Sequence, residues 1–298
     1  MQQSTGAVLI TAAASGIGAA CTKMLVQQGW WVLAGVRNTT QGETLRQQTG
    51  GQITPLLLDV TDAELIQAAA EHVRALLDQT QSALIGVVNT ATREHHGPLE
   101  LLPLAFVRQE LEVDCLGTLA VIQAFLPLLR RSRGRIVNFS SVTGRCVFRG
   151  IGASCAAKYA VEAISDALRL ELAPWGIHVA VIEPGAVATP LWDKTQQAFE
   201  DLPNHVPQEK LRLYYPSWPE AVQRAKADQE MYVRMAMPPE RIAHAVCHVL
   251  TSRKPKTRYL VADWQTRGLI WLKQWLPDRW FDRLAMGQFR DQTVVVTD

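Results

Sequence analysis

The stretch GRIVNFSSVTGRCVFRGIGASCAAKYAVEAISDALRLELAPWGIHVAVIEPGAVATP, residues 134–190, decides the fold. Its apolar spacing predicts a strand over 135–139, a helix over 152–173 and a second strand over 177–183, with a loop after each strand. A strand–helix–strand order of this length is typical of a βαβ unit with parallel strands. Both loops then open at the carboxyl ends of strands, where α/β sheets bind ligands.

The rest of the chain repeats this alternation. Further strands are predicted over 7–11, 30–36, 53–59, 84–89 and 258–262, and helices over 16–28, 41–48, 62–78, 103–130 and 238–251. The pattern favours an α/β fold, a Rossmann-like doubly wound parallel sheet, in one domain over 1–262. Residues 191–237 are polar and interrupted by prolines, and we expect them to form a mobile helical substrate lid within this domain.

Composition narrows the class of protein. The chain has 298 residues, 48% of them hydrophobic, and a net charge of +2, which argues against a nucleic-acid partner. Its five cysteines are scattered without CxxC spacing, so we expect no metal site, no disulfide framework and a cytoplasmic location. The N-terminus lacks the layout of a signal peptide, and no apolar run reaches the length of a membrane span.

The tail over 263–298 is rich in aromatic residues. An apolar stripe predicts an amphipathic helix, with tryptophans at 264, 271, 275 and 280. Three roles are open for it: packing on the protein's own core or pocket, contact with a membrane surface, and contact within an oligomer.

The first predicted strand runs into a glycine-rich turn, TAAASGIG over 11–18, and then into a helix. Such a turn can cradle a pyrophosphate, because backbone N–H groups and the helix N-terminus face the phosphates. Gly16 and Gly18 would permit close backbone approach. Ala12 would be strained by about 1–2 kcal/mol if its position needs a positive φ, and unstrained if φ is negative.

Several motifs in order resemble the short-chain dehydrogenase/reductase family over about residues 5–262. The turn at 11–18 is similar to the family's TGxxxGxG, with Ala12 for the first glycine. Asn89-Thr90-Ala91-Thr92 stands where the family has NNAG, so that Thr92 is expected to crowd the cofactor ribose. Residues 184–189, PGAVAT, match PGxxxT. The likeness is strongest to hydroxysteroid and retinol dehydrogenase-like members.

The resemblance implies a nicotinamide dinucleotide cofactor. An arginine after the second strand, Arg37, with no acidic residue between 30 and 41, favours NADP over NAD. The cofactor-binding positions implied by the family are Thr11, Ser15, Gly16, Ile17, Gly18, Arg37, Asp59, Val60, Asn89, Ala91, Lys158, Pro184, Gly185, Val187 and Thr189. A lone strand-end aspartate such as Asp59 can equally be a turn residue.

The resemblance also implies a catalytic set of tyrosine, lysine, serine and asparagine. Lys158 and Ser141 match the lysine and the serine. Ser154 stands where the reactive tyrosine belongs, and Asp114 where the asparagine belongs. A serine hydroxyl is a far weaker acid than a phenol and reaches less far, so simple carbonyl reduction should lose the roughly 10²–10⁴ that a positioned acid contributes.

Other groups could substitute for the phenol. His95 and His96 follow the fourth strand and could act as acid or base near neutral pH, or be surface histidines. Asp114 could pair with Lys158, act as a base, or be a near-isosteric replacement of asparagine. Arg145 and Arg149 could favour an anionic substrate, or be solvated loop charges.

Three functions follow from these observations. The first is an NADP-dependent oxidoreductase for a lipophilic alcohol or ketone with a non-standard catalytic site. The second is a non-redox isomerase, cyclase or lyase on the same scaffold, and the third is a catalytically silent binding or partner subunit. The resemblance further implies a homodimer through the helices over 103–130 and 152–173, and the partners expected are small lipophilic or anionic molecules.

Overall fold

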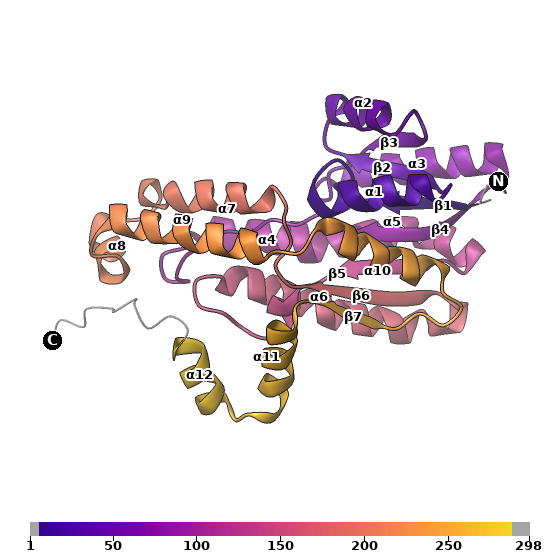
Figure 1. Cartoon of the computed structure of the whole chain (residues 1–298). Coiled ribbons are helices and arrows are strands. Elements are labelled where there is room, and N and C mark those ends of the chain that lie inside the picture. The colour runs from indigo at the N-terminus through magenta and orange to yellow at the C-terminus, as the bar shows by residue number, and fades with distance from the viewer. Residues whose placement is uncertain (1–5, 288–298) are drawn as a thin grey trace.

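The computed structural model describes residues 6–287, and its centre is a parallel sheet (Figure 1). Seven strands lie in the order β3-β2-β1-β4-β5-β6-β7, as the sequence predicts for a doubly wound fold. The order reverses between β1 and β4, which makes the crevice at their carboxyl ends the expected ligand site. The strands are β1 (Gly6–Ile10), β2 (Trp31–Val36), β3 (Ile53–Leu57), β4 (Ala83–Asn89), β5 (Arg135–Phe139), β6 (His178–Pro184) and β7 (Arg258–Val261).

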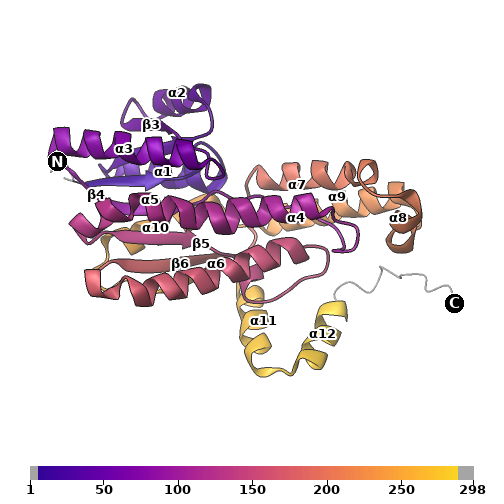
Figure 2. The same ribbon diagram turned by 180° about the vertical axis from the view of Figure 1, so that it is seen from behind.

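Helices cover both faces of the sheet. One face carries α1 (Gly16–Gln27) and α10 (Pro239–Thr251), which pack through residues such as Leu25 and Val246 (Figure 1). The other carries α3 (Ala63–Thr80), α5 (Gly117–Ser132) and α6 (Gly152–Glu171) (Figure 2). The short α2 (Thr39–Gln48) lies by β2 and β3. Because both faces are covered, the central strands are continuous apolar runs rather than alternating ones.

The helix predicted over 103–130 is continuous but not regular. It consists of α4 (Leu104–Glu110), a π-helical turn at Leu111–Leu116, and α5. A π turn inside a helix often marks a functional position, and this one holds the buried Asp114. The sequence pattern does not reveal it, because a π turn shifts the apolar register by a single residue.

The same run, Leu104–Ser132, corrects one sequence expectation. It is long and apolar enough to cross a membrane by length and composition, whereas no such run was expected. Its apolar side faces the sheet, since Ile122, Phe125 and Leu129 are fully buried in the core. The apolar composition is therefore that of a core helix.

The lid lies beyond the carboxyl edge of the sheet and is helical, as predicted (Figure 1). It comprises α7 (Leu191–Glu200), α8 (Gln208–Tyr214) and α9 (Trp218–Met235). Leu202, Val206 and Leu211 attach it to Leu101, Leu102 and Ala153 of the body in a separate apolar cluster. Its mobility stays a prediction.

The tail forms two helices where one was expected. They are α11 (Trp264–Trp275) and α12 (Asp278–Gly287), and they form a hairpin that projects from the body (Figures 1 and 2). Pro277 between them interrupts the helix. Residues 288–298 of the predicted tail lie outside the described residues.

Candidate active site

The glycine-rich turn between β1 and α1 has the close backbone packing that a pyrophosphate cradle needs. A Cβ added to Gly18 would lie 2.4 Å from the Ala12 carbonyl oxygen, so only glycine fits there. Gly16 has a φ of +49° and Ala12 a φ of +48°. The alternative of a negative φ at Ala12 is therefore wrong. The turn keeps its family conformation at a cost of about 1–2 kcal/mol.

Threonines join β1 to β4 at the reversal of the strand order. The Thr11 hydroxyl accepts hydrogen bonds from the backbone N–H groups of Thr90 (3.0 Å) and Ala91 (3.2 Å). The Thr90 hydroxyl donates to the Thr11 carbonyl at 2.5 Å. The asparagine that the family has at position 90 is thus replaced by a residue that ties the two strands together.

Asn89 lies in the core rather than at the rim. Its amide donates to Asn138 at 2.9 Å, and Asn138 donates in turn to Ser165. The Asn89 Oδ1 is buried without a partner among the described residues.

The PGxxxT segment faces the glycine turn from across the crevice. A Cβ on Gly16 would lie 3.3 Å from the Thr189 side chain, so the two loops nearly touch. Val187 is held from the lid side: it forms a bridge with Met237, and its carbonyl accepts a hydrogen bond from Trp192 at 2.8 Å. Pro184 and Gly185 precede it at the end of β6.

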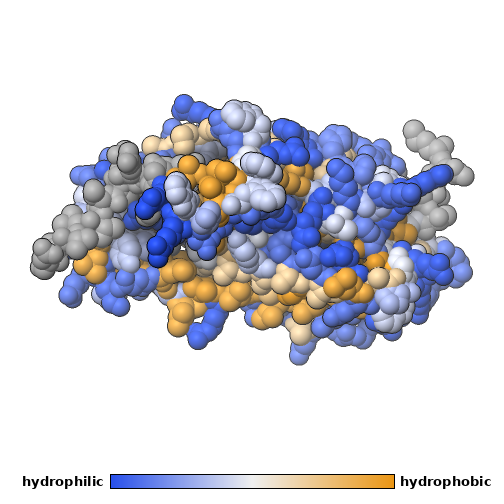
Figure 3. All heavy atoms as spheres, turned by 90° about the horizontal axis from the view of Figure 1, so that it is seen from below, coloured by the Kyte–Doolittle hydropathy of each residue, from blue (hydrophilic) through white to orange (hydrophobic). Residues whose placement is uncertain are grey.

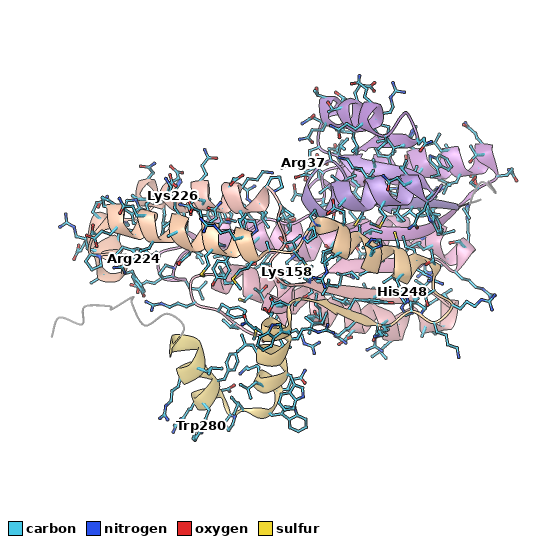
Figure 4. The ribbon with its side chains drawn as sticks, in the orientation of Figure 1. Arg37, Lys158, Arg224, Lys226, His248 and Trp280 are labelled. Carbon is cyan, nitrogen blue, oxygen red and sulfur yellow. The ribbon has the colours of Figure 1, made fainter. Side chains whose placement is uncertain are left out.

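The adenosine end of the crevice is an open depression of about 520 Å³. Arg37 and Asp59 line it from the ends of β2 and β3, and Figure 4 shows Arg37 at that end of the sheet. Asp59 accepts hydrogen bonds from the backbone and hydroxyl of Thr61, so it also acts as a turn residue. Val60 is buried, and its carbonyl lies close against Gly117.

These residues fit an extended dinucleotide. The open depression suits a nucleoside, and the turn at 12–18 leads into α1, with Ser15 as the N-cap and Ile17 in the first turn. The first N–H groups of a helix have no partner within the helix and can face a pyrophosphate. Among the described residues, the atoms nearest to a Cβ added at Gly16 belong to the Thr189 side chain. Those nearest to a Cβ added at Gly18 belong to the Ala12 backbone and the Thr90 side chain. The cofactor positions inferred from the sequence are therefore brought together along one edge.

Lys158 lies at the centre of the site, bound to Asp114. Its Nζ is 2.5 Å from the Asp114 carboxylate, and both side chains are almost fully buried. The Lys158 ammonium also donates to the Phe139 carbonyl (3.2 Å) and the Thr92 hydroxyl (3.3 Å). Of the roles left open for Asp114, the structure shows the pairing with lysine.

Thr92 completes this group. Its hydroxyl donates to Asp114 Oδ1 at 2.6 Å, while the backbone N–H of Arg93 donates to Oδ2 at 2.9 Å. Thr92 is itself exposed. One hydroxyl thus lies between a carboxylate and an ammonium. Sequence reasoning treated Thr92 only as a source of crowding. Thr92 follows the end of β4, opposite Asp114, and a polar side chain at that place could have indicated the contact.

The two serines of the site differ in environment. Ser141 is half-buried after β5, where its hydroxyl accepts from the Thr143 N–H (3.2 Å) and donates to the Pro184 carbonyl (3.4 Å). This geometry fixes the hydroxyl between the two loops. Ser154 is 5% exposed on α6, four residues before Lys158. A short buried hydroxyl there cannot take the place of a phenol that would extend into the site.

The histidines of the loop after β4 are paired with glutamates. His95 is buried, bonded through Nδ1 to Glu110 at 2.9 Å and stacked on Phe106, which marks it as a structural residue. Burial raises the pKa of Glu110, although His95 opposes this. His96 is half-buried and lies 3.2 Å from Glu94.

The Glu94–His96 pair is a charged one. Burial alone would lower the pKa of His96, but the hydrogen bond and charge of Glu94 raise it overall. The pKa of Glu94 is lowered by His96 and Lys158, which outweigh the effect of burial. The raised pKa favours the protonated form of His96, whose partner is the Glu94 carboxylate rather than a substrate group.

Arg145 is not a solvated loop charge. It lies 3.0 Å from the buried Glu183, and Arg258 lies between Glu183, Glu162 and Asp166. Burial, with the neighbouring charge of Glu162, raises the pKa of Glu183 to about 7. Arg149 is exposed. One of the two cations expected for an anionic substrate is thus already neutralised.

A doubly wound parallel sheet with a glycine turn, a switch-point crevice and a buried lysine defines a dinucleotide-binding α/β protein of the oxidoreductase kind. The sequence pattern of the short chain dehydrogenase family matches residues 6–200, and the chain belongs to this family. The family supports an NAD(P)-dependent oxidoreductase that acts on alcohols or ketones.

Individual relatives of the chain include dehydrogenases of this family. The chain is 34% identical to mouse retinol dehydrogenase 5 over 92% of this chain and 86% of that protein. It is 35% identical to bovine mitochondrial D-beta-hydroxybutyrate dehydrogenase over 87% of this chain and 77% of that one. A short chain dehydrogenase from Burkholderia cenocepacia, solved in complex with NADP, has the same fold, with a TM-score of 0.70, 22% identity and coverage of 95% and 99%.

The comparisons leave two sequence expectations unsupported. A cytoplasmic location has no support, since one of these relatives is mitochondrial by name. The choice between NADP and NAD is not decided by the family.

Proposed function

We propose that the chain is an NADP-dependent reductase or dehydrogenase of a lipophilic alcohol or ketone, in which Lys158, Thr92 and Asp114 replace the missing phenol. The observation that carries this proposal is the hydroxyl of Thr92, an exposed residue, held 2.6 Å from the Asp114 carboxylate and 3.3 Å from the Lys158 ammonium. The cofactor supplies the hydride. The chain must then supply the proton.

A proton source of suitable strength is present. An ammonium and a phenol are acids of similar strength, each with an ordinary pKa near about 10, whereas an aliphatic hydroxyl is far weaker. In the reductive direction the Thr92 hydroxyl turns its proton from Asp114 to the alkoxide oxygen of the product, and the Thr92 oxygen takes a proton from the Lys158 ammonium. Asp114 holds both partners in place through its contacts with the Thr92 hydroxyl and the Lys158 ammonium. Ser141 orients the substrate oxygen from the β5 side.

NADP rather than NAD is supported by Arg37. It is exposed beside the depression at the end of β2. The first acidic residue that follows it, Glu43, is bonded to Arg46 at 2.8 Å and is not available to a ribose hydroxyl. A guanidinium in this place suits a 2′-phosphate.

A lipophilic substrate is supported by the lid. Phe199, Tyr215 and Trp218 pack their rings together at 5.0–5.7 Å between centroids. The retinol dehydrogenase among the relatives is by name an enzyme of a lipophilic alcohol. We also propose a homodimer through the outer sides of α5 and α6, where Leu170 of α6 and Leu116, at the end of the π turn that precedes α5, are exposed.

The test follows the hydride and the proton separately. The purified chain is incubated with NADPH deuterated at the transferable position and with a panel of lipophilic aldehydes and ketones, and mass spectrometry detects deuterium in the alcohol. We expect deuterium transfer, a loss of about 10²-fold or more in Thr92→Val, and retention in Thr92→Ser. Transfer that is equal in Thr92→Val and the parent protein would refute the proton path.

One observation favours a non-redox use of the scaffold. The Lys158 ammonium is engaged by Asp114 at 2.5 Å, so it is less open to a ribose than a lysine opposite a neutral asparagine. If the deuterium experiment yields no labelled alcohol while NADPH binds, an isomerase, cyclase or lyase reaction at Thr92 and Asp114 becomes the better account.

A further inference from the structure

The hairpin of α11 and α12 exposes an unusual amount of aromatic surface. Trp264, Trp271, Trp275 and Trp280 are 79%, 62%, 72% and 64% exposed. Figure 4 shows Trp280 pointing away from the body of the molecule. Large exposed aromatic side chains that gather on one element mark an interaction surface rather than a solvated one.

The opposite side of the hairpin is firmly anchored. Ile270 and Phe281 are 4% and 3% exposed, and they pack with Val142 and Cys146 of the segment after β5. That segment begins at Ser141, so the hairpin rests on the wall of the active site. The outward tryptophans therefore belong to a packed element with two distinct sides.

The hairpin also carries charged side chains, some paired within it and some exposed. Asp263 caps α11 through the backbone of Thr266, and Asp278 pairs with Lys273 at 2.5 Å. Arg267, Arg279 and Arg283 are exposed, and the Arg283 guanidinium lies 6.0 Å above the Trp280 ring. Two of the acidic groups thus serve the hairpin itself, while three exposed guanidinium groups, one of them over the Trp280 ring, lie on the same two helices with the exposed Asp282.

We propose that this hairpin docks the protein on the surface of a phospholipid bilayer that contains anionic headgroups. Indole rings favour the depth of the headgroups, where their apolar body and polar N–H are both satisfied, and arginines beside them attract anionic lipids. The inference needs no assumption about substrate or cofactor.

The shape of the hairpin favours a bilayer over a second copy of the chain. It is a convex element that projects below the sheet, so a flat surface can reach all its outward rings (Figures 1 and 2). Seen from below, hydrophobic side chains form a band along one side of the molecule, and much of the rest of this face is hydrophilic (Figure 3). Trp271 and Trp275 form a tilted pair, with 6.4 Å between their ring centroids, and both remain more than half exposed.

The test uses the full chain and vesicles of phosphatidylcholine alone or mixed with phosphatidylglycerol. Binding is measured by co-flotation and by quenching of tryptophan fluorescence with bromine-labelled lipids. We expect binding to the mixed vesicles that weakens as salt is added, and an affinity about tenfold lower or more when the four tryptophans are replaced by serine. The matched control is Trp175→Ser, which removes an exposed tryptophan on another surface and should leave vesicle binding unchanged.

Three outcomes would overturn the proposal. The parent chain fails to bind either kind of vesicle; the four-tryptophan variant binds as well as the parent; or sedimentation shows that the tryptophans hold two copies together and vesicles add nothing. The single variants Trp264→Ser and Trp275→Ser, each with a thermal unfolding curve, keep the test decisive if the fourfold variant does not fold. Each should lower the fraction of protein that floats with the mixed vesicles, a readout that does not depend on the tryptophan removed.

Discussion

The pairing of Lys158 with Asp114 predicts that the two departures from the family's catalytic set depend on each other. Restoring the phenol by Ser154→Tyr places it near an ammonium whose charge is already balanced by a carboxylate 2.5 Å away. The substitution alone should therefore recover only part of the family's activity, and Asp114→Asn should release the rest.

The magnitude follows from the charges. A phenol oxygen about 4 Å from an ammonium gains about 4 kcal/mol at an effective dielectric constant near 20, which would lower the phenol's pKa by roughly 3 units. A carboxylate about 6 Å away opposes this by about 2.8 kcal/mol, or roughly 2 units. Ser154→Tyr alone should then gain about tenfold or less in kcat/KM, and the double variant about 10²–10⁴ over the parent.

The parent background should respond in the opposite direction. Without a phenol, Asp114 positions the Thr92 hydroxyl and the Lys158 ammonium, so Asp114→Asn alone should lower kcat by about tenfold. The same substitution is thus harmful with Ser154 and beneficial after Ser154→Tyr. The assay is consumption of NADPH with one carbonyl substrate across all four proteins, with thermal unfolding as the check on folding, since Asp114→Asn weakens a buried ion pair. Equal activity of Ser154→Tyr with and without Asp114→Asn would refute the reasoning.

Three further predictions rest on single contacts. Ala12→Gly should raise the free energy of unfolding by about 1 kcal/mol, because it removes the strain of the positive φ. Ala14→Gly, its control in the same turn, should lower the free energy of unfolding, and thermal unfolding measures both changes. The pKa of Glu183 is raised from 4.5 to about 7, so the folded protein holds this proton more tightly than the unfolded chain and loses stability as the pH rises through that window. Glu183→Gln should flatten the loss in denaturant curves across those pH values, and an unchanged slope would count against the burial argument. Arg37→Glu should weaken NADPH binding by about tenfold or more and NADH binding little, while Arg74→Glu, at an exposed arginine on α3, should change neither.

Much of the fold could be predicted because each strand and helix has its own local signal. β5 was predicted to the residue, and most other elements to within two or three. The sheet follows from the alternation of buried apolar strands with amphipathic helices. Two features were not predicted. The π turn at Leu111–Leu116 leaves no trace in the apolar spacing, and Pro277 divides the tail, predicted as one helix, into two.

The site was harder to predict because its chemistry lies in contacts between distant segments. The resemblance to the family located Lys158, Asp114 and Ser154, but residue types alone could not decide whether Asp114 pairs with the lysine. Thr92 was noticed only for its size, since its hydroxyl gains meaning from Asp114, 22 residues away. His95 carried the right chemistry for catalysis, yet its burial against Glu110 and Phe106 depends on packing that no motif records.

We expect the crevice to bind a nicotinamide dinucleotide although two catalytic residues differ from the family. Titration of the purified chain with NADPH and NADH, followed by the fluorescence of the bound nucleotide, measures this binding. We predict micromolar binding of NADPH, about tenfold tighter than that of NADH. No binding of either nucleotide would contradict this expectation and leave a pocket that works without hydride transfer.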